Sequence, residues 1–208
     1  MAWMKVLLIR HGMTEGNRKR QYIGTTDEPV CPEGMQQLRL LKKQARDMDR
    51  DYKSQLVFIS PMLRCRQTAE ILFDKVPDDV RMIPVPALRE MDFGVFEGRA
   101  WKDDLEHDPQ YLKWLETECE GAVPGGERRQ EFADRCLAGF CQAMKEAKEL
   151  GRRQRIETVA FVVHGGTLMS ILSGLSEEPG NFYSFMADNG HGYAGYWDGR
   201  KLSGICKI

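Results

Sequence analysis

Three short apolar runs rich in β-branched residues most constrain how this chain can fold. They span Lys5 to Ile9, Leu56 to Ile59 and Thr158 to Val163. A strand that is apolar at nearly every position, rather than at alternate positions, is buried on both faces, which is typical of a parallel sheet covered by helices on either side. Helical patterns lie between these runs, so the sequence predicts an α/β fold.

Helices are predicted where apolar residues recur at helical spacing. One such segment runs from Met35 to Met48, and a longer one runs from Phe132 to Ala147 and should end near Gly151. Another helix is expected over Thr167 to Leu172, directly after two glycines.

Two further strand patterns are weaker. Val80 to Val85 is limited by prolines, which an edge strand tolerates. Gly192 to Trp197 and Lys201 to Lys207 flank Asp198-Gly199, a pair of residues that favours a β-hairpin turn.

The length of 208 residues predicts a single domain, 1–208. We expect a three-layer α/β/α sandwich with a mostly parallel central sheet and helices on both faces. Residues 98–127 lack a strong strand and are interpreted as a small helical insertion over the carboxyl-terminal edge of the strands. Its Trp101, Tyr111 and Trp114 either stack on a substrate ring or pack the insertion against the helices, and the sequence leaves both interpretations open.

Composition narrows the function classes. Lys plus Arg is 30 and Asp plus Glu is 31, a net charge of −1, which gives no support for a nucleic-acid or anionic-membrane partner. No apolar stretch is long enough for a secretory signal or a membrane span. The six cysteines form no CxxC pair, which argues against a zinc site and favours reduced thiols in a cytoplasmic protein. The oligomeric state is not readable from the sequence.

Charged and imidazole side chains follow the predicted buried strands. Arg10 and His11 end the first run, Arg64 lies one turn into the helix after the second, and His164 ends the last. If these strands are parallel neighbours, all four side chains project from one edge of the sheet, where α/β proteins bind their ligands.

Such a cluster suits a phosphorylated ligand. Two guanidiniums repel each other unless a dianion lies between them, and a guanidinium binds phosphate oxygens in pairs. A neutral imidazole beside them can attack phosphorus without a metal and form a phosphohistidine. Two other interpretations are weaker: a metal hydrolase built on His11 and His164, whose cation the arginines would repel, and a nucleophilic Cys65, which lacks the glycine-rich loop of thiol phosphatases.

Four short motifs follow one another along the chain. Leu8 to Asn17 resembles the RHGxTxxN signature, and Ser60 to Ala69 is similar to SxLxRxxQTA. Leu88 to Gly98 resembles LxExxFGxxEG, and Val162 to Gly166 reads VVHGG. In this order the four motifs resemble those of the histidine phosphatase (phosphoglycerate mutase-like) superfamily.

This resemblance implies a role for each matching residue. His11 would carry the phosphoryl group, and Glu90 would protonate the leaving oxygen and later activate water, so both would be catalytic together with Arg10, Arg64 and His164. The resemblance also implies a set of residues that bind phosphate or substrate: Arg10, Asn17, Ile23, Gly24, Thr25, Arg64, His164 and Gly165.

The sequence around Glu90 distinguishes branches of the family. Residues 91–98 read MDFGVFEG, which resembles the short-chain phosphatases, including the α-ribazole phosphatases of cobalamin biosynthesis, whereas mutases typically read ERHYG there. The resemblance therefore predicts a metal-independent phosphomonoesterase that needs no cofactor and acts on a small phosphorylated metabolite, with α-ribazole 5′-phosphate as the candidate substrate. The alternatives are a cofactor-dependent phosphoglycerate mutase and a non-catalytic phosphate-binding module.

Some residues depart from the family pattern or stay open. Cys31 stands where a Ser or Thr often caps the following helix, and we expect a small cost in stability. Met13 replaces a common acidic residue. The basic segment 18–20 either recognises a second anion or is a solvated loop, and His191 lies either at the rim of the site or in a loop.

Overall fold

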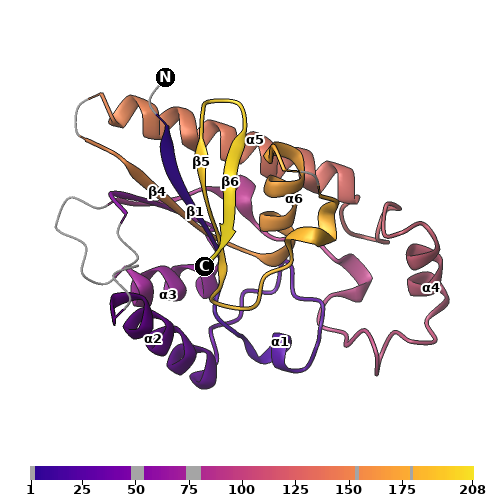
Figure 1. Ribbon diagram of the computed structural model, residues 1–208. Helices are drawn as coiled ribbons and strands as arrows, with labels where there is room; N and C mark the ends of the chain where they lie inside the picture. Colours follow the sequence, from indigo (N-terminus) through magenta and orange to yellow (C-terminus); the bar gives the residue numbers. More distant parts are fainter. Residues whose placement is uncertain (1–2, 48–53, 74–80, 153–154, 179) are drawn as a thin grey trace.

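The computed structural model describes residues 3–47, 54–73, 81–152, 155–178 and 180–208 (Figure 1). Its strands form a six-stranded sheet in the order β3-β2-β4-β1-β5-β6. The strands are β1 (Met4–Arg10), β2 (Leu56–Ile59), β3 (Arg81–Pro84), β4 (Thr158–Val163), β5 (Gly192–Trp197) and β6 (Leu202–Lys207). Neighbours from β3 to β1 are parallel, whereas β5 and β6 add two antiparallel pairings. The predicted α/β class with a mostly parallel sheet is confirmed.

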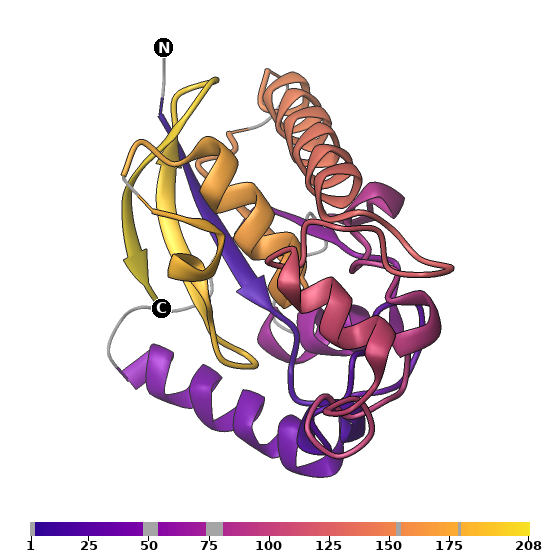
Figure 2. The same ribbon diagram turned by 90° about the vertical axis from the view of Figure 1, so that its right-hand side faces the viewer.

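Helices cover both faces of this sheet. The α-helices are α1 (Glu15–Arg18), α2 (Pro32–Asp47), α3 (Leu63–Leu72), α4 (Pro109–Glu116), α5 (Arg129–Leu150) and α6 (Gly165–Leu175). Short 3-10 helices are η1 (Pro86–Leu88), η2 (Gly94–Phe96) and η3 (Phe182–Phe185). In Figures 1 and 2, α5 and α6 lie on one side of the sheet and α2 and α3 on the other.

The alternation of side chains along each strand divides the apolar core in two. Val6 and Leu8 of β1 belong to the core under α5 and α6, which also holds Phe58 and Phe161. Leu7 and its neighbours on the opposite face belong to the core under α2 and α3. Because successive strand residues point to opposite faces, a run that is apolar throughout can fill both cores, as the sequence pattern predicts.

The observed elements agree closely with the patterns. Position 48 of the first predicted helix and position 80 of the weak strand lie outside the described residues. The rest of the weak strand forms β3, which lies at the sheet edge, as its prolines predict. The helix expected from Thr167 begins two residues earlier, at Gly165, because His164 is still extended and the chain turns directly from β4 into α6.

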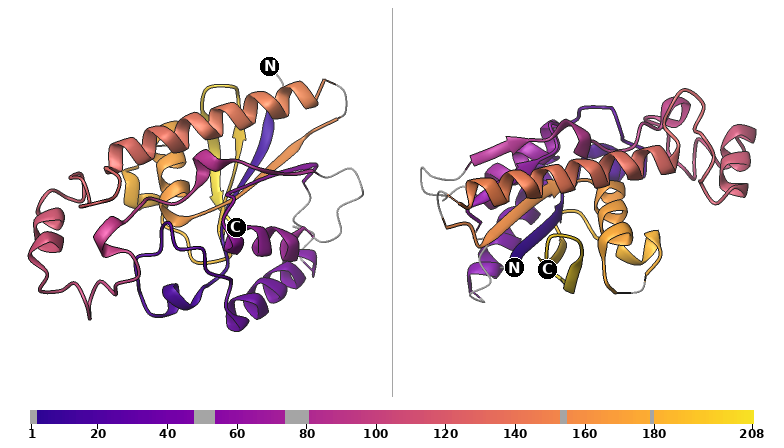
Figure 3. Two further views of the ribbon diagram at one scale, coloured as in Figure 1. Left: turned by 180° about the vertical axis from the view of Figure 1, so that it is seen from behind. Right: turned by 90° about the horizontal axis from the view of Figure 1, so that it is seen from above.

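The insertion over 98–127 contains α4 and no named strand among the elements of the described chain. Figure 3 shows it projecting from one end of the molecule. Tyr111 and Trp114 are buried against Tyr22 and Phe96, with ring centroids 5.4–5.9 Å apart. The packing interpretation therefore holds for these two rings, whereas Trp101 is 45% exposed.

Strand register brings three strand ends to one level. Arg10 pairs with Val163, and Ile59 pairs with Val162, so β1, β4 and β2 end side by side. His11 extends this alignment by donating its backbone N–H to the Val163 carbonyl at 2.9 Å. Residues that directly follow these strands must therefore meet at one edge.

None of the helices in the described part of the chain is long and apolar enough to cross a membrane.

The stacked rings of Phe58 and Phe161 test the core. Phe58→Ala should lower the free energy of unfolding by about 3–5 kcal/mol, because it leaves a cavity between the sheet and α5. Urea unfolding followed by circular dichroism measures this loss. Leu112→Ala, at a side chain 44% exposed on α4, is the control and should change stability by less than about 0.5 kcal/mol. Equal losses in the two variants would contradict this account of the core.

Candidate active site

His11 is held immediately beyond β1 with a defined tautomer. Its Nδ1 lies 2.8 Å from the Gly12 carbonyl oxygen, which can only accept, so Nδ1 carries the hydrogen. The lone pair therefore resides on Nε2. Thr68 Oγ1 accepts the Gly12 backbone N–H at 2.8 Å, which ties this turn to α3. The arrangement presents Nε2 as the nucleophilic atom of the ring.

His164 lies beside His11 and is orientated at both ring nitrogens. The two ring centroids are 5.2 Å apart. The Arg64 Nε–H donates to His164 Nδ1 at 3.2 Å, so the ring hydrogen is on Nε2 and faces Ser60 Oγ at 2.7 Å. Since Ser60 directly follows β2, Arg64 lies in the first turn of α3 and His164 directly follows β4, this network joins β2, α3 and β4.

The fully buried Arg64 also holds the loop that the resemblance assigns to substrate binding. Its Nη1 donates to the Thr26 carbonyl at 2.7 Å, and its Nη2 donates to the Gly24 carbonyl at 2.9 Å. The Ile23 carbonyl lies farther away, at 3.5 Å, and Thr25 is exposed. These acceptors are all uncharged, so the positive charge of Arg64 is not neutralised by them.

Arg10 approaches the same place from β1. Its Nη1 donates to the Ala187 carbonyl at 2.8 Å, while its buried Nε has no acceptor within the described residues. An alanine Cβ at position 165 would lie 3.4 Å from that Nε, so the start of α6 is close to the guanidinium. Burial lowers the pKa of Arg10, and the charges of Glu90 and Asp188 oppose this effect. A buried donor of this kind suits an anionic ligand.

Glu90 reaches the cluster from the segment after η1. Its carboxylate accepts the Met91 N–H at 3.0 Å and the Gly166 N–H at 2.9 Å. Burial raises the pKa of Glu90, and these two hydrogen bonds and the charges of Arg64 and Arg10 oppose the rise. Gly166 is required here, because a Cβ at that position would collide with the Glu90 carboxylate.

Both imidazoles are in surroundings that disfavour their charged form. Burial lowers the pKa of His11 well below its ordinary value, and Arg64 and Arg10 lower it further. Burial and then Arg64 do the same to the pKa of His164. The rings are therefore neutral near pH 7, which leaves the His11 lone pair available for attack.

The structure thus places Arg10, His11, Arg64 and His164 in one cluster, with Glu90 and Gly165 beside it. A family model for the histidine phosphatase superfamily (branch 1) matches residues 6–201.

The chain belongs to the histidine phosphatase superfamily.

Individual relatives of this chain carry different names. A Hydrogenobacter thermophilus protein with the provisional name phosphoserine phosphatase 2 is 30% identical over 189 residues, 89% of this chain and 85% of that protein. An Enterobacter sp. (strain 638) protein named probable phosphoglycerate mutase GpmB is 31% identical over 173 residues, 83% of this chain and 76% of its own length. The α-ribazole phosphatase from Shigella flexneri has a crystal structure that matches with a TM-score of 0.72 at 26% identity, covering 92% of this chain and 89% of that one. These names share the family and differ in substrate.

Two side-chain amides, from Asn17 and Asn189, hold the backbone around His11. Asn17 Oδ1 accepts the Thr14 N–H at 3.3 Å and the Asn189 Nδ2–H at 3.0 Å. The same Asn189 amide donates to the His11 carbonyl at 3.1 Å. Asn17 belongs to the RHGxTxxN motif, whereas no sequence pattern marks Asn189. Asn189 lies near the other end of the chain and is brought to the site by the pairing of β5 with β1.

The carboxylate of Glu97, to which the sequence patterns assign no role, also binds the backbone of the loop that Arg64 holds. Glu97 Oε1 accepts the N–H groups of Gly24 at 2.7 Å and Thr26 at 2.9 Å. Arg64 binds the carbonyls of the same two residues, so the loop is held between a cation and an anion. The FGxxEG pattern contains this Glu, but nothing in the pattern indicates that it binds backbone.

The structure also describes the surroundings of two cysteines and of the basic segment that the sequence left open. Cys65 is buried, and burial raises the pKa of its thiol, which opposes a nucleophilic role. Cys31 does cap α2, because its Sγ accepts the Gly34 N–H at 3.4 Å, so the cap is present although weaker than one from oxygen. Arg18 and Lys19 form ion pairs with Glu15, which favours the solvated-loop interpretation.

The His191 side chain contacts the C-terminal residue rather than the ring of His11. Its Nδ1 is 3.2 Å from the Ile208 carbonyl, and its own carbonyl accepts the Arg10 backbone N–H at 2.9 Å.

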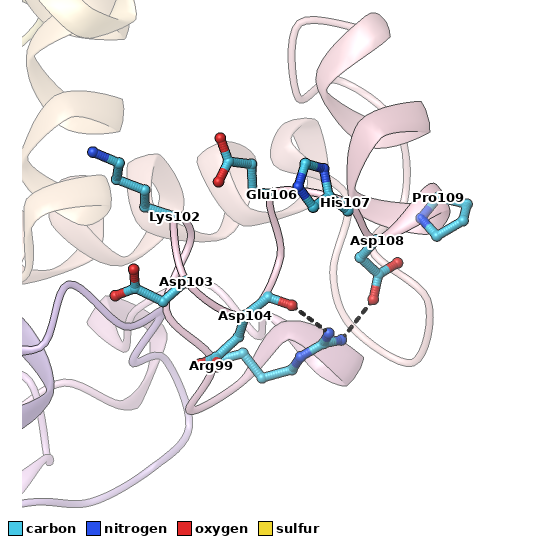
Figure 4. Close-up of a pocket in the computed structure, with 8 residues that line it drawn as sticks. All are labelled: Arg99, Lys102, Asp103, Asp104, Glu106, His107, Asp108 and Pro109. Carbon is cyan, nitrogen blue, oxygen red and sulfur yellow. Dashed lines mark hydrogen bonds and ion pairs between the residues drawn. The ribbon is translucent and has the colours of Figure 1, made fainter.

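A separate pocket in the insertion, shown in Figure 4, is lined by Arg99, Lys102, Asp103, Asp104, Glu106, His107, Asp108 and Pro109. It contains none of Arg10, His11, Arg64 and His164, the four residues of the cluster at the strand ends, which we name the phosphate cluster.

The tautomers and charge states of the two rings are testable by nitrogen NMR of histidine-labelled protein. As the pH falls through 6.5, the ordinary pKa of histidine, both rings should stay neutral, because burial and the arginines lower their pKa values. The shifts should show hydrogen on Nδ1 of His11 and on Nε2 of His164. Free imidazole in the same tube gives the reference titration, and His11→Gln identifies one signal. Protonation of either ring near pH 6.5 would contradict the described electrostatics.

Proposed function

We propose that this histidine phosphatase hydrolyses phosphomonoesters through a phosphohistidine at His11. The observation that carries the proposal is the lone pair on His11 Nε2 beside the buried guanidinium of Arg64 and the half-buried guanidinium of Arg10, whose buried Nε–H has no acceptor in the described chain. A phosphate dianion supplies both the charge and the acceptor that this arrangement lacks.

In the first step the ester phosphate binds among Arg10, Arg64 and the start of α6. His11 Nε2 attacks phosphorus, an N–P bond forms, and the P–O bond to the leaving group breaks. Glu90, whose pKa is raised, gives its proton to the departing oxygen, so the product leaves as a neutral alcohol. The guanidiniums stabilise the negative charge on the equatorial oxygens of the transferring group.

In the second step water attacks the phosphohistidine. The Glu90 carboxylate accepts a proton from that water, an O–P bond forms, and the N–P bond breaks. Inorganic phosphate is released and His11 returns to its neutral form. The bond from Nδ1–H to the Gly12 carbonyl holds the ring in the same tautomer throughout.

We propose α-ribazole 5′-phosphate as the substrate, which would place the protein in cobalamin biosynthesis. The structural similarity to the Shigella flexneri α-ribazole phosphatase and the short sequence after Glu90 support this choice. We propose that turnover needs no metal, since the charges of Arg10 and Arg64 would repel a cation, and that it resists EDTA. All six cysteines are free thiols, which supports our proposal of a cytoplasmic location.

Phosphoglycerate mutase activity is the second candidate, favoured by the name of the Enterobacter relative. A mutase returns its phosphoryl group to a phosphoglycerate, whereas a phosphatase gives it to water. A panel of α-ribazole 5′-phosphate, phosphoserine and phosphoglycerates separates the two when both phosphate release and phosphoglycerate isomerisation are measured. A non-catalytic binding module would show neither.

His11→Ala should abolish phosphate release and leave the fold intact, because it removes the atom that carries the phosphoryl group. Wild-type protein quenched during turnover should contain acid-labile, alkali-stable phosphate on His11, detected by mass spectrometry. His107→Ala, at an exposed histidine of the insertion, is the matched control and should keep its activity and its phosphorylation. A His11→Ala protein with wild-type turnover would remove the phosphohistidine mechanism.

The role of Glu90 predicts the direction of a pH effect. Its pKa is raised above the ordinary 4.5, and only the protonated acid can assist the leaving oxygen, so kcat/KM should fall as pH rises through that pKa. Glu90→Gln should lower kcat/KM for an alkyl phosphate about 10²- to 10⁴-fold and remove the corresponding limb of the pH profile. A limb that persists unchanged in Glu90→Gln would assign this titration to another group.

A further inference from the structure

An ion pair outside the phosphate cluster connects the insertion with α5. Arg135 Nε donates to Glu127 Oε1 at 2.9 Å, and its Nη2 donates to Oε2 at 2.7 Å. The pair is therefore bidentate, which fixes the plane of the guanidinium as well as its distance. Glu127 closes the insertion, and Arg135 lies in the second turn of α5.

Both members of this pair bind the backbone of the segment that carries Glu90. Arg135 Nη1 donates to the carbonyls of Ala87 at 2.8 Å and Arg89 at 3.1 Å, and Nη2 donates to the Glu90 carbonyl at 3.3 Å.

On the other side of Glu90, the Glu127 residue binds Asp92 twice. Glu127 Oε2 accepts the Asp92 N–H, and the Glu127 N–H donates to the Asp92 carbonyl, each at 3.0 Å. The backbone is thus held both before and after Glu90 by the two charges of one ion pair.

Glycines allow the two segments to approach this closely. A Cβ at Gly126 would collide with the Asp92 carbonyl, and one at Gly94 would collide with the Pro124 carbonyl. Gly94 also has a φ of +46°, which favours glycine. The side chains of Arg135 and Glu127 are 23% and 26% exposed, and ion pairs in such positions contribute little stability on average. Their contacts with the backbone around Glu90 are the more specific feature.

We propose that the Glu127–Arg135 ion pair is a positioning device that sets the Glu90 carboxyl against the leaving oxygen of the substrate. This inference rests on the proposed function, in which Glu90 is the proton donor. Neither residue touches substrate; both act by fixing the backbone from which Glu90 projects. A displacement of about 1 Å at a catalytic group can lower the rate on the order of 10²-fold, so loss of this backbone support should slow proton transfer from Glu90.

The test is the dependence of kcat/KM on the leaving group. A good leaving group such as nitrophenolate departs without protonation, whereas an alkoxide requires the proton of Glu90. We therefore measure kcat/KM, which reports the transfer to His11, for nitrophenyl, phenyl and alkyl phosphates. Glu127→Gln and Arg135→Gln should each lower the alkyl rate about 10- to 100-fold and the nitrophenyl rate less than about 3-fold.

The two substitutions change the local charge in opposite directions. Glu127→Gln removes a negative charge near Glu90, and Arg135→Gln removes a positive one. If the pair acts through its geometry, both variants lose activity with the same leaving-group dependence. If it acts only through its charge, the two variants change the alkyl rate in opposite directions, and that result overturns the proposal.

A matched control exists in the insertion. Arg99 Nη1 donates to Asp108 Oδ2 at 2.8 Å, and its Nη2 donates to the Asp104 carbonyl at 2.9 Å (Figure 4). Arg99 therefore also forms an ion pair and binds backbone. Arg99→Gln should leave the leaving-group dependence unchanged. Arg135→Lys keeps the charge without the bidentate geometry and should resemble Arg135→Gln; thermal unfolding of each variant confirms that the compared proteins are folded.

The outcomes separate this inference from the function on which it rests. A uniform loss across all leaving groups, or no loss, in Glu127→Gln and Arg135→Lys overturns the positioning role. If Glu90→Gln itself shows no leaving-group dependence, Glu90 is not the acid, and both the proposed mechanism and this inference fail. A steep dependence in Glu90→Gln, Glu127→Gln and Arg135→Gln, absent from Arg99→Gln, supports both.

Discussion

The buried guanidinium of Arg64 is the feature on which the rest of the site depends. A cation removed from water is costly unless hydrogen bonds and an opposite charge compensate it. In the described chain the Arg64 guanidinium donates to an imidazole nitrogen and to backbone carbonyls, all of them uncharged. These contacts fix its position and leave its charge for a ligand. The same charge, together with burial, lowers the pKa of both histidines. The Arg64 guanidinium thus orders the loop at residues 24–26, supplies a charge that suits an anion and, with burial, keeps His11 neutral.

Charged side chains fix two segments of the site by binding their backbone groups. Glu97 and Arg64 hold the N–H groups and carbonyls of the loop at Gly24, and the Glu127–Arg135 pair holds the chain around Glu90. Loops have few apolar contacts of their own, so charged side chains that bind their peptide groups give them a fixed shape. The same device occurs on both sides of the phosphate cluster.

Sequence reasoning succeeded where a residue's role follows from its place on a strand or in a motif. The apolar runs of β1, β2 and β4 predicted a sheet buried on both faces, and the residues after them were expected to meet. It did not assign Asn189, whose amide contacts His11 and Asn17 from the far end of the chain. It also left the rings of the insertion open, since an aromatic residue in a loop packs inward or faces solvent according to neighbours such as Tyr22.

The sequence by itself determined the fold class, the family and the chemical types at the strand ends, because these depend on local periodicity and on residue order within short motifs. The tertiary structure alone decided which nitrogen of each histidine carries hydrogen, which carbonyls Arg64 binds and which ion pair supports Glu90. The physical reason is that tautomers, pKa shifts and hydrogen-bond partners are set by groups that are close in space and distant in sequence. Arg64 and His164, separated by 100 positions, share one hydrogen bond that no local pattern specifies.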